Sequence, residues 1–249
     1  MLDEWPSPLV IGHRGASAKA PENTISAFAL AIQEGADAIE FDVKLSSDDH
    51  VVVIHDHTLE RTTNGKGKVA ETSLKSLKEL DAGSKFSQEF AGENIPTLDE
   101  VFEVVGNKIL MNVELTNYST PLDGLVGKVV ELVKKHGMEK QVLFSSFLAR
   151  NLRITRRLLP EVPRGLLAYS GWLGFLARNV GQKKQFQALH PYLDDVNQDL
   201  VRKIHAAGKR IHVWTVNGEE NLKKMLEYSV DGIFTDDPGF LRQLLGQSE

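Results

Sequence analysis

Two acidic residues share one face of a predicted strand. Glu40 and Asp42 lie in an apolar run over 38–43, and successive strand side chains point to opposite faces, so their Cα atoms lie about 6.6 Å apart on the same face. Buried carboxylates are costly unless a cation lies between them. Oxygen ligands suit Mg²⁺ or Ca²⁺. These residues alone fit a divalent metal site and a pair of solvated acids on an edge strand equally well.

A third carboxylate favours the metal site. Glu114 follows Asn112 by two positions in the next predicted strand, so both side chains point inward. Three carboxylates from two neighbouring strands make an oxygen-ligand site for one divalent cation, Mg²⁺ or Ca²⁺. The alternative is that Glu114 pairs with a nearby Lys or Arg.

Two histidines and an arginine add proton-transfer and anion-binding chemistry. His13 and His55 follow predicted strands, and histidine titrates near neutrality, so it can act as acid or base. Their position beside the predicted carboxylates favours a catalytic pair. Arg14 can hold a phosphate with a bidentate fork, or be a solvated loop charge. Trp214 can line the substrate site or pack in the core.

A zinc hydrolase is the competing enzyme. His55-Asp56-His57 is a His-x-His pair of the kind found in metal-dependent amidohydrolases, and His190, His212 and Asp236 can be assigned as further zinc ligands. That assignment leaves the three carboxylates without a role, which counts against it.

The elements that must position these residues alternate regularly. Predicted strands near Val10, Glu40 and Val113 are followed by five further strand–helix units. Eight units in 249 residues predict an α/β fold, a (β/α)₈ TIM barrel, as a single domain over 1–249. Its site would lie at the C-terminal ends of the strands. The alternative is a doubly wound sheet, whose first and last strands do not pair.

The hairpin after the second strand should carry His55. Only residues 44–50 separate the run over 51–54 from the second strand, and this is too short for a parallel crossover, so we predict an antiparallel pair. A turn near 47–48 would then place His55 roughly opposite Glu40. Residues 56–96 are rich in Thr, Gly, Lys and Ser and are predicted to form a small insertion.

Composition narrows the partners. The net charge of −5 gives no basic footprint for nucleic acid. The absence of cysteine excludes disulfides, thiolate zinc sites and a Cys nucleophile. We see no signal-peptide pattern and no run of about 18 apolar residues, so we expect a cytoplasmic protein without stable membrane insertion. As a separate expectation, the protein is a monomer or homodimer. The apolar stretch over 172–176 is predicted to be a core helix, with lipid contact as the alternative.

Short motifs along the chain resemble the glycerophosphodiester phosphodiesterase family. They run from about Val10 to Pro238 and are Gly12-His13-Arg14-Gly15, Pro21-Glu22-Asn23-Thr24, Glu40-Phe41-Asp42-Val43, His55-Asp56, Arg61-Thr62-Thr63-Asn64-Gly65, Ile95-Pro96-Thr97-Leu98, Asn112-Val113-Glu114-Leu115, Trp214-Thr215-Val216-Asn217 and Thr235-Asp236. Each is weak alone, but their order and spacing together are specific.

The resemblance implies a TIM barrel with a small insertion after strand two. It implies Mg²⁺ or Ca²⁺ on Glu40, Asp42 and Glu114, and His13 with His55 as the acid/base pair. Arg14 would bind the phosphate and Trp214 would lie near the glycerol. The implied reaction converts a small glycerophosphodiester and water to an alcohol and glycerol 3-phosphate, in some members through a cyclic phosphate. A non-catalytic barrel that binds a phosphorylated ligand is the alternative outside enzymes.

One position departs from the family pattern. Many members have a lysine two residues after the last metal carboxylate, and this chain has Thr116 there. A hydroxyl adds no charge, so phosphate affinity or head-group preference is in question. Lys44 could compensate, but we expect its side chain to face outward relative to Asp42.

Overall fold

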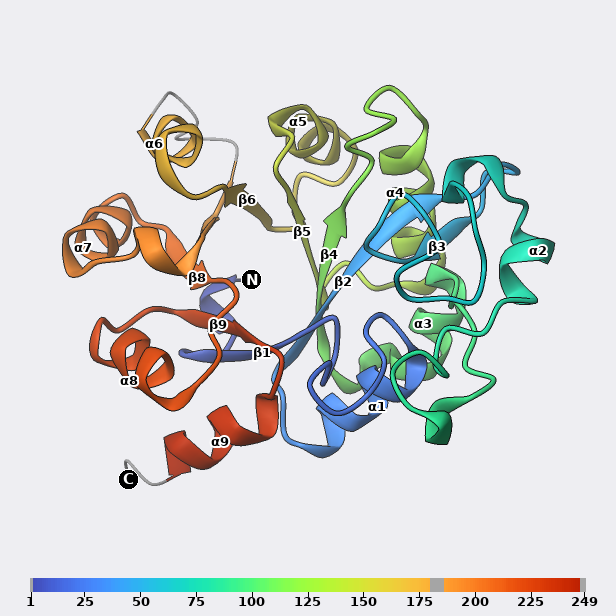
Figure 1. Ribbon diagram of the computed structural model, residues 1–249. Helices are drawn as coiled ribbons and strands as arrows, with labels where there is room; N and C mark the ends of the chain where they lie inside the picture. The colour runs from blue at the N-terminus through green and yellow to red at the C-terminus, as the bar shows by residue number, and fades with distance from the viewer. Residues whose placement is uncertain (1, 180–185, 247–249) are drawn as a thin grey trace.

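The computed structural model describes residues 2–179 and 186–246, which form a closed barrel of parallel strands (Figure 1). The barrel strands are β1 (Leu9–His13), β2 (Ala38–Leu45), β4 (Leu110–Leu115), β5 (Val142–Ser146), β6 (Arg164–Ala168), β7 (Ala188–Pro191), β8 (Arg210–Val213) and β9 (Gly232–Thr235). β1 pairs in parallel with both β2 and β9. Because the first and last strands pair, the sheet closes. The prediction of a (β/α)₈ barrel is confirmed, and the doubly wound sheet is wrong.

Helices surround the strands on the outside of the barrel (Figure 1). The α-helices are α1 (Ile25–Gln33), α2 (Leu74–Lys78), α3 (Leu98–Val105), α4 (Leu125–His136), α5 (Ala149–Leu158), α6 (Gly171–Asn179), α7 (Gln198–Ala206), α8 (Glu219–Glu227) and α9 (Pro238–Gly246). Short 3₁₀ turns are η1 (Leu2–Glu4), η2 (Val69–Glu71), η3 (Gln88–Phe90), η4 (Gly106–Lys108) and η5 (Leu193–Asp195).

Side-chain caps begin the two helices beside the site. The Oγ1 atom of Thr24 accepts a hydrogen bond from the backbone of Ala27 at the start of α1. Thr97 and Glu100 form a reciprocal capping box at the start of α3. These bonds satisfy amide groups that a helix start leaves without partners, so both helices begin at fixed residues.

Alternation along β2 separates the core from the site. Ile39, Phe41 and Val43 belong to the apolar cluster under the helices, and the Phe41 ring lies 5.5 Å from that of Phe28 on α1. Side chains at alternate positions face the other side of a strand. The helix packing of the odd-numbered residues therefore turns the even-numbered ones toward the barrel axis.

The hairpin forms as predicted, but its register differs by one residue. β3 (Val51–Val53) is antiparallel to β2, and Val53 pairs with Val43. The turn spans five residues, 46–50, and closes with a hydrogen bond from the Ser46 amide to the His50 carbonyl. The expectation that His55 lies opposite Glu40 is therefore wrong, because this turn is longer than the one assumed and the strand ends before His55.

The segment over 56–96 contains η2, α2 and η3 and packs on the hairpin. A small apolar cluster joins the two, made of Val52, Ile54, Leu59, Val69, Leu77, Ala82 and Ile95. This cluster anchors the loop that carries His55 at the barrel mouth.

The start of α6 differs from its prediction as a core helix. Trp172 is 71% exposed and Leu173 is 68% exposed, and the Trp172 ring stacks on Phe175 at 5.6 Å. Positions i and i+3 share one helix face, and here that face points to solvent. The side chain of Leu176, the last residue of the predicted stretch, lies outside the described residues. Within residues 2–179 and 186–246, no helix has the length and apolar character that a bilayer span requires.

Candidate active site

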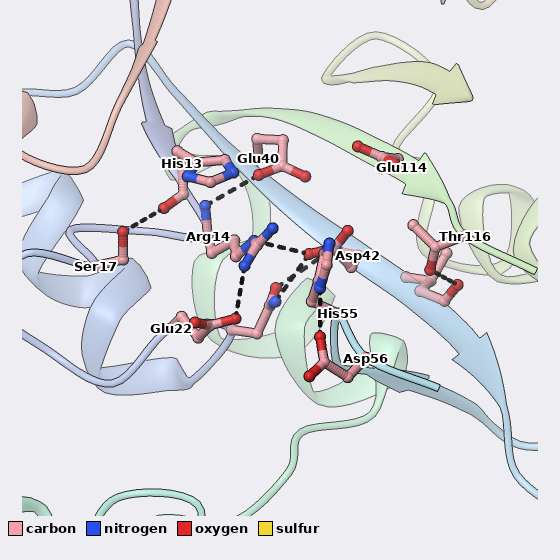
Figure 2. A network of polar contacts seen from close by, with 12 residues as sticks. His13, Arg14, Ser17, Glu22, Glu40, Asp42, His55, Asp56, Glu114 and Thr116 are labelled. Atoms are coloured by element: carbon pink, nitrogen blue, oxygen red, sulfur yellow. Dashed lines mark hydrogen bonds and ion pairs between the residues drawn. The ribbon is translucent and has the colours of Figure 1, made fainter. Parts of the chain in front are cut away.

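The three predicted metal ligands meet at the ends of β2 and β4. Asp42 pairs with Glu114 across the two strands, and Glu40 pairs with Asn112. One carboxylate oxygen from each of Glu40, Asp42 and Glu114 lies within 4.8 Å of the others. Figure 2 shows Glu40 and Asp42 on one strand and Glu114 on its neighbour. The alternation argument therefore placed these side chains correctly.

The electrostatics of this cluster suit a hard divalent cation. Burial raises the pKa of Glu40 well above its ordinary value, and repulsion from Asp42 and Glu114 adds to that effect. Burial and Asp42 raise the pKa of Glu114 to about 8. Burial acts the same way on Asp42, but the nearby charges, that of Arg14 foremost, and a hydrogen bond from Asn23 together lower the pKa of Asp42. An all-oxygen donor set with surplus negative charge fits Mg²⁺ or Ca²⁺.

Arg14 is held among carboxylates at the edge of the cluster. Its Nη1 atom donates to Glu22 at 2.9 Å, its Nε atom lies 3.3 Å from an oxygen of Asp42, and its backbone amide donates to Glu40 at 3.0 Å (Figure 2). The turn after β1, which carries Arg14, requires a glycine at the next position. Gly15 has φ +88°, and a Cβ there would lie 2.6 Å from the backbone of Ala27.

His13 is oriented by a carboxylate from the far end of the chain. Its Nδ1 atom lies 2.7 Å from Asp236, which also accepts hydrogen bonds from Ser17 and Asn217. Burial alone would raise the pKa of Asp236, but the hydrogen bonds with His13 and Asn217 lower it to about 2. An ionised carboxylate on Nδ1 fixes the ring and leaves Nε2 for proton exchange.

His55 has an equivalent partner from the residue next to it. Its Nδ1 atom lies 2.6 Å from Asp56 (Figure 2). Arg61 donates to both oxygens of Asp56 and to both oxygens of Glu22. Glu22 in turn holds Arg14. A continuous chain of charged hydrogen bonds therefore links His55 to Arg14, the proposed phosphate-binding residue.

The partner residues had no assigned role in the sequence analysis. Asp56, Arg61, Glu22 and Asp236 appeared only as parts of motifs or of the zinc alternative. Asp56 could have been found, because it directly follows His55. Local spacing does not pair Asp236 with His13, because 223 positions separate them and only the closure of the barrel brings them together.

One cavity of about 390 Å³ joins these groups to an aromatic wall. Its lining residues are His13, Arg14, Glu40, His55, Glu114, Tyr118, Phe147, Leu167, Tyr169, Trp214, Thr215 and Phe234. The Tyr118 hydroxyl donates to Glu114 at 2.7 Å, and Trp214 packs edge-on to Phe147 with ring centroids 5.7 Å apart. The cavity is acidic with imidazoles at one side and apolar at the other. Tyr118 is a site residue that the sequence analysis missed.

Contrary to our expectation, the side chain of Lys44 does not face outward. It lies on the same face of β2 as Glu40 and Asp42, is 8% exposed, and donates to the carbonyl and hydroxyl oxygens of Thr116 at 2.7 and 2.9 Å. The expectation contradicted the two-residue alternation of a strand. Burial lowers the pKa of Lys44, while Asp42 and Glu114 act in the opposite direction.

The residues of the zinc alternative do not gather. His190 and His212 are buried inside the barrel, where their rings stack at 5.0 Å. Burial lowers the pKa of His212 to about 4. His57 is exposed on the insertion, and Asp236 binds His13. Within the described ranges, Glu40, Asp42 and Glu114 form the one group of three or more His, Asp or Glu side chains close enough to hold a metal ion.

Comparison with known proteins agrees with this geometry. The sequence model of the "Glycerophosphoryl diester phosphodiesterase family" matches residues 13–240. The chain belongs to this family. A glycerophosphodiester phosphodiesterase of Caldanaerobacter subterraneus subsp. tengcongensis is 42% identical over 238 residues, covering 95% of this chain and 97% of that protein. A protein of the same name from Bacillus altitudinis is 37% identical and covers 92% and 94%.

Solved structures of family members have the same fold. An Oleispira antarctica phosphodiesterase, in complex with the product sn-glycerol-3-phosphate, superposes with a TM-score of 0.87 at 35% identity, covering 96% of this chain and 97% of the other. The glycerophosphodiester phosphodiesterase of Agrobacterium tumefaciens gives 0.80 at 28% identity and covers 95% and 99%. The family therefore spans the whole barrel, including its mouth.

Proposed function

We propose that this enzyme hydrolyses glycerophosphodiesters to an alcohol and glycerol 3-phosphate with one divalent cation and a pair of histidines. The observation that carries the proposal is the single cavity in which His13, His55, Glu40 and Glu114 converge. The product complex of the Oleispira antarctica relative supports the choice of substrate. The zinc-hydrolase and non-catalytic alternatives have no comparable gathering of residues.

Two imidazoles provide the proton transfers. One removes a proton from the attacking oxygen, and the other protonates the departing alkoxide, so that water is added across the broken P–O bond. The attacking oxygen belongs to water or to a neighbouring glycerol hydroxyl, and the second route passes through a cyclic phosphate. Asp236 and Asp56 orient the two rings through Nδ1.

The remaining residues bind and orient. Glu40, Asp42 and Glu114 would hold Mg²⁺ or Ca²⁺. When bound, the ion supplies charge stabilisation at the phosphoryl oxygens and lowers the pKa of the nucleophile. Arg14 would contact the phosphate from the cavity wall, and Trp214 would pack against the glycerol or alcohol part.

A coupled assay for released glycerol 3-phosphate tests the proposal. We expect turnover of glycerophosphodiesters by the protein as purified, its loss in excess EDTA, and its return with Mg²⁺ or Ca²⁺. Activity that persists after complete metal removal, verified by elemental analysis, would contradict the role of the carboxylates. Assaying several head groups in parallel identifies the preferred alcohol.

Two further predictions concern the whole protein. We propose a cytoplasmic location, tested by cell fractionation, and a monomer or homodimer, tested by light scattering during gel filtration. The expected partner is a small molecule; a nucleic acid is not expected because the net charge is −5.

A further inference from the structure

We propose that Lys44 is a positioning residue that sets the charge balance of the site: its ammonium weakens the hold of the carboxylates on the cation and strengthens the hold on the anionic phosphate. In naming phosphate as the anion, this inference rests on the proposed function. It assigns to Lys44 the positive charge that a residue at position 116 cannot supply in this chain.

The placement of Lys44 is the first argument. Glu40, Asp42 and Lys44 occupy alternate positions of β2, so the ammonium lies in the same inward column as two proposed ligands, toward the C-terminal end of the strand. Its Nζ atom reaches Thr116, two residues beyond Glu114. The Lys44 ammonium therefore connects the ends of the two strands that carry all three carboxylates.

The lack of a direct anionic partner is the second argument. Lys44 is buried, and both oxygens that it contacts belong to Thr116, which is neutral. Among the residues that the structure describes, no carboxylate lies within 4.0 Å of its Nζ atom. An ammonium has three N–H donors and this one uses two. A buried charge is costly without compensation, and an anionic ligand at the neighbouring cluster would add to the compensation that the carboxylates there give from a distance.

Thr116 is adapted to hold a lysine from the neighbouring strand. Its hydroxyl donates to the Val43 carbonyl at 2.8 Å and, as an acceptor, receives the Lys44 bond at 2.9 Å. A hydroxyl can act in both directions at once. The pair Lys44 and Thr116 is therefore one unit, in which one residue provides the charge and the other fixes its position.

The test uses two binding measurements on Lys44→Met. Calorimetry gives the Mg²⁺ affinity of the metal-stripped full-length protein and, at saturating Mg²⁺, the affinity for glycerol 3-phosphate. Loss of a nearby positive charge should tighten Mg²⁺ binding and weaken glycerol 3-phosphate binding, each by roughly tenfold. A purely structural role predicts that both affinities fall together. Unchanged affinities, or a joint loss, would overturn the proposal.

A second-site variant separates charge from packing. Lys44→Met combined with Thr116→Lys should return both affinities toward those of the original protein, and failure to recover would show that the effect does not come from charge. Lys209→Met is the matched control, because Lys209 donates to the Phe186 carbonyl beside the start of β8, at the other end of the barrel. It should shift neither affinity.

Two provisions keep the result decisive. Circular dichroism checks folding, and if Lys44→Met does not fold, Lys44→Gln keeps a donor for Thr116 while removing the charge. Failure of the proposed function is a separate outcome: it would appear as an original protein that releases no glycerol 3-phosphate from diesters. An active original protein with unshifted affinities in the Lys44 variant defeats only the present inference.

Discussion

The barrel contains two pairs of histidines with opposite surroundings. At the mouth, the Nδ1 atoms of His13 and His55 lie 2.7 and 2.6 Å from a carboxylate. Inside the barrel, the rings of His190 and His212 stack at 5.0 Å, and both nitrogens of His190 and Nε2 of His212 have no hydrogen-bond partner among the described residues. All four follow or belong to strands, so their position in the sequence pattern does not distinguish them.

The two pairs differ in how deeply their rings are buried and in whether a carboxylate contacts one ring nitrogen and leaves the other free to exchange a proton. A carboxylate on Nδ1 fixes the orientation of the ring, so Nε2 is left to exchange a proton. Deep burial without such a partner keeps an imidazole neutral. The mouth pair is therefore the pair that we propose for proton transfer, whereas the interior pair fills the barrel core.

The largest expected effect separates the mouth pair from its neighbours. His13→Ala and His55→Ala should fold normally and lose about 10²–10⁴-fold in kcat, the usual contribution of general acid–base catalysis. His57→Ala is the matched control, because His57 is exposed on the same segment as His55; it should keep its activity. Full turnover in either mouth variant would remove the acid/base assignment, and an inactive His57→Ala would revive the zinc alternative.

A smaller loss is expected when the carboxylate partners are neutralised. Asp236→Asn and Asp56→Asn should lower kcat by roughly tenfold to a hundredfold, at or below the loss of the imidazole itself. Asp237→Asn controls for the loop of Asp236, because Asp237 binds Lys19 rather than His13. If the asparagine variants match the original protein in steady-state assays, the carboxylates do not distinguish the two pairs.

The interior pair should affect stability instead of turnover. A Cβ at Gly165 would lie 2.3 Å from the His190 ring, so Gly165→Ala should lower the free energy of unfolding by about 1–3 kcal/mol. Gly127→Ala on α4 meets nothing within 4 Å and should stabilise by about 0.5–1 kcal/mol. Urea denaturation measures both. A neutral Gly165→Ala would mean that the interior rings are loosely packed.

The smallest effect is a difference in pH dependence. The unfolded chain protonates His212 near its ordinary value while the folded pKa is about 4, so the unfolded state binds more protons and stability falls as the pH drops below about 6.5. Glu114 behaves oppositely in the metal-free protein. Its folded pKa of about 8 means that the native state binds more protons, so stability falls as the pH rises from about 4.5 through 8.

Denaturation at a series of pH values in EDTA should therefore show that stability decreases toward both acid and alkaline pH. Glu114→Gln should flatten the alkaline limb, and saturating Mg²⁺ should do the same because a bound cation keeps the carboxylate ionised. An alkaline limb that Glu114→Gln leaves unchanged would show that other groups produce it.

Much of the fold was predictable because its signals are local. Alternating apolar runs and helical stretches predicted the strand–helix order, and the number of units predicted closure. The hairpin register failed by one residue because it depends on the geometry of a five-residue turn. The exposure of Trp172 was missed because an apolar helix face does not reveal whether anything covers it.

The part of the candidate site that depends on alternation along one strand was predictable. Alternation brought Glu40 and Asp42 together, and the same rule, correctly applied, would have included Lys44. It could not find Asp236, because contacts between distant strands follow from closure and not from spacing. The opposite environments of His13 and His190 likewise depend on which side chains surround each ring in the folded barrel.

Because the barrel closes between its first and last strands, activity should require almost the full-length polypeptide. β1 pairs with β9, and the contact between His13 and Asp236 spans 223 positions. A truncated polypeptide that stops before residue 236 would carry all three proposed metal ligands and both imidazoles, yet would lack this contact. Partial products released early from a ribosome should therefore be poor catalysts, because His13 at the end of the first strand lacks the carboxylate that follows the last strand.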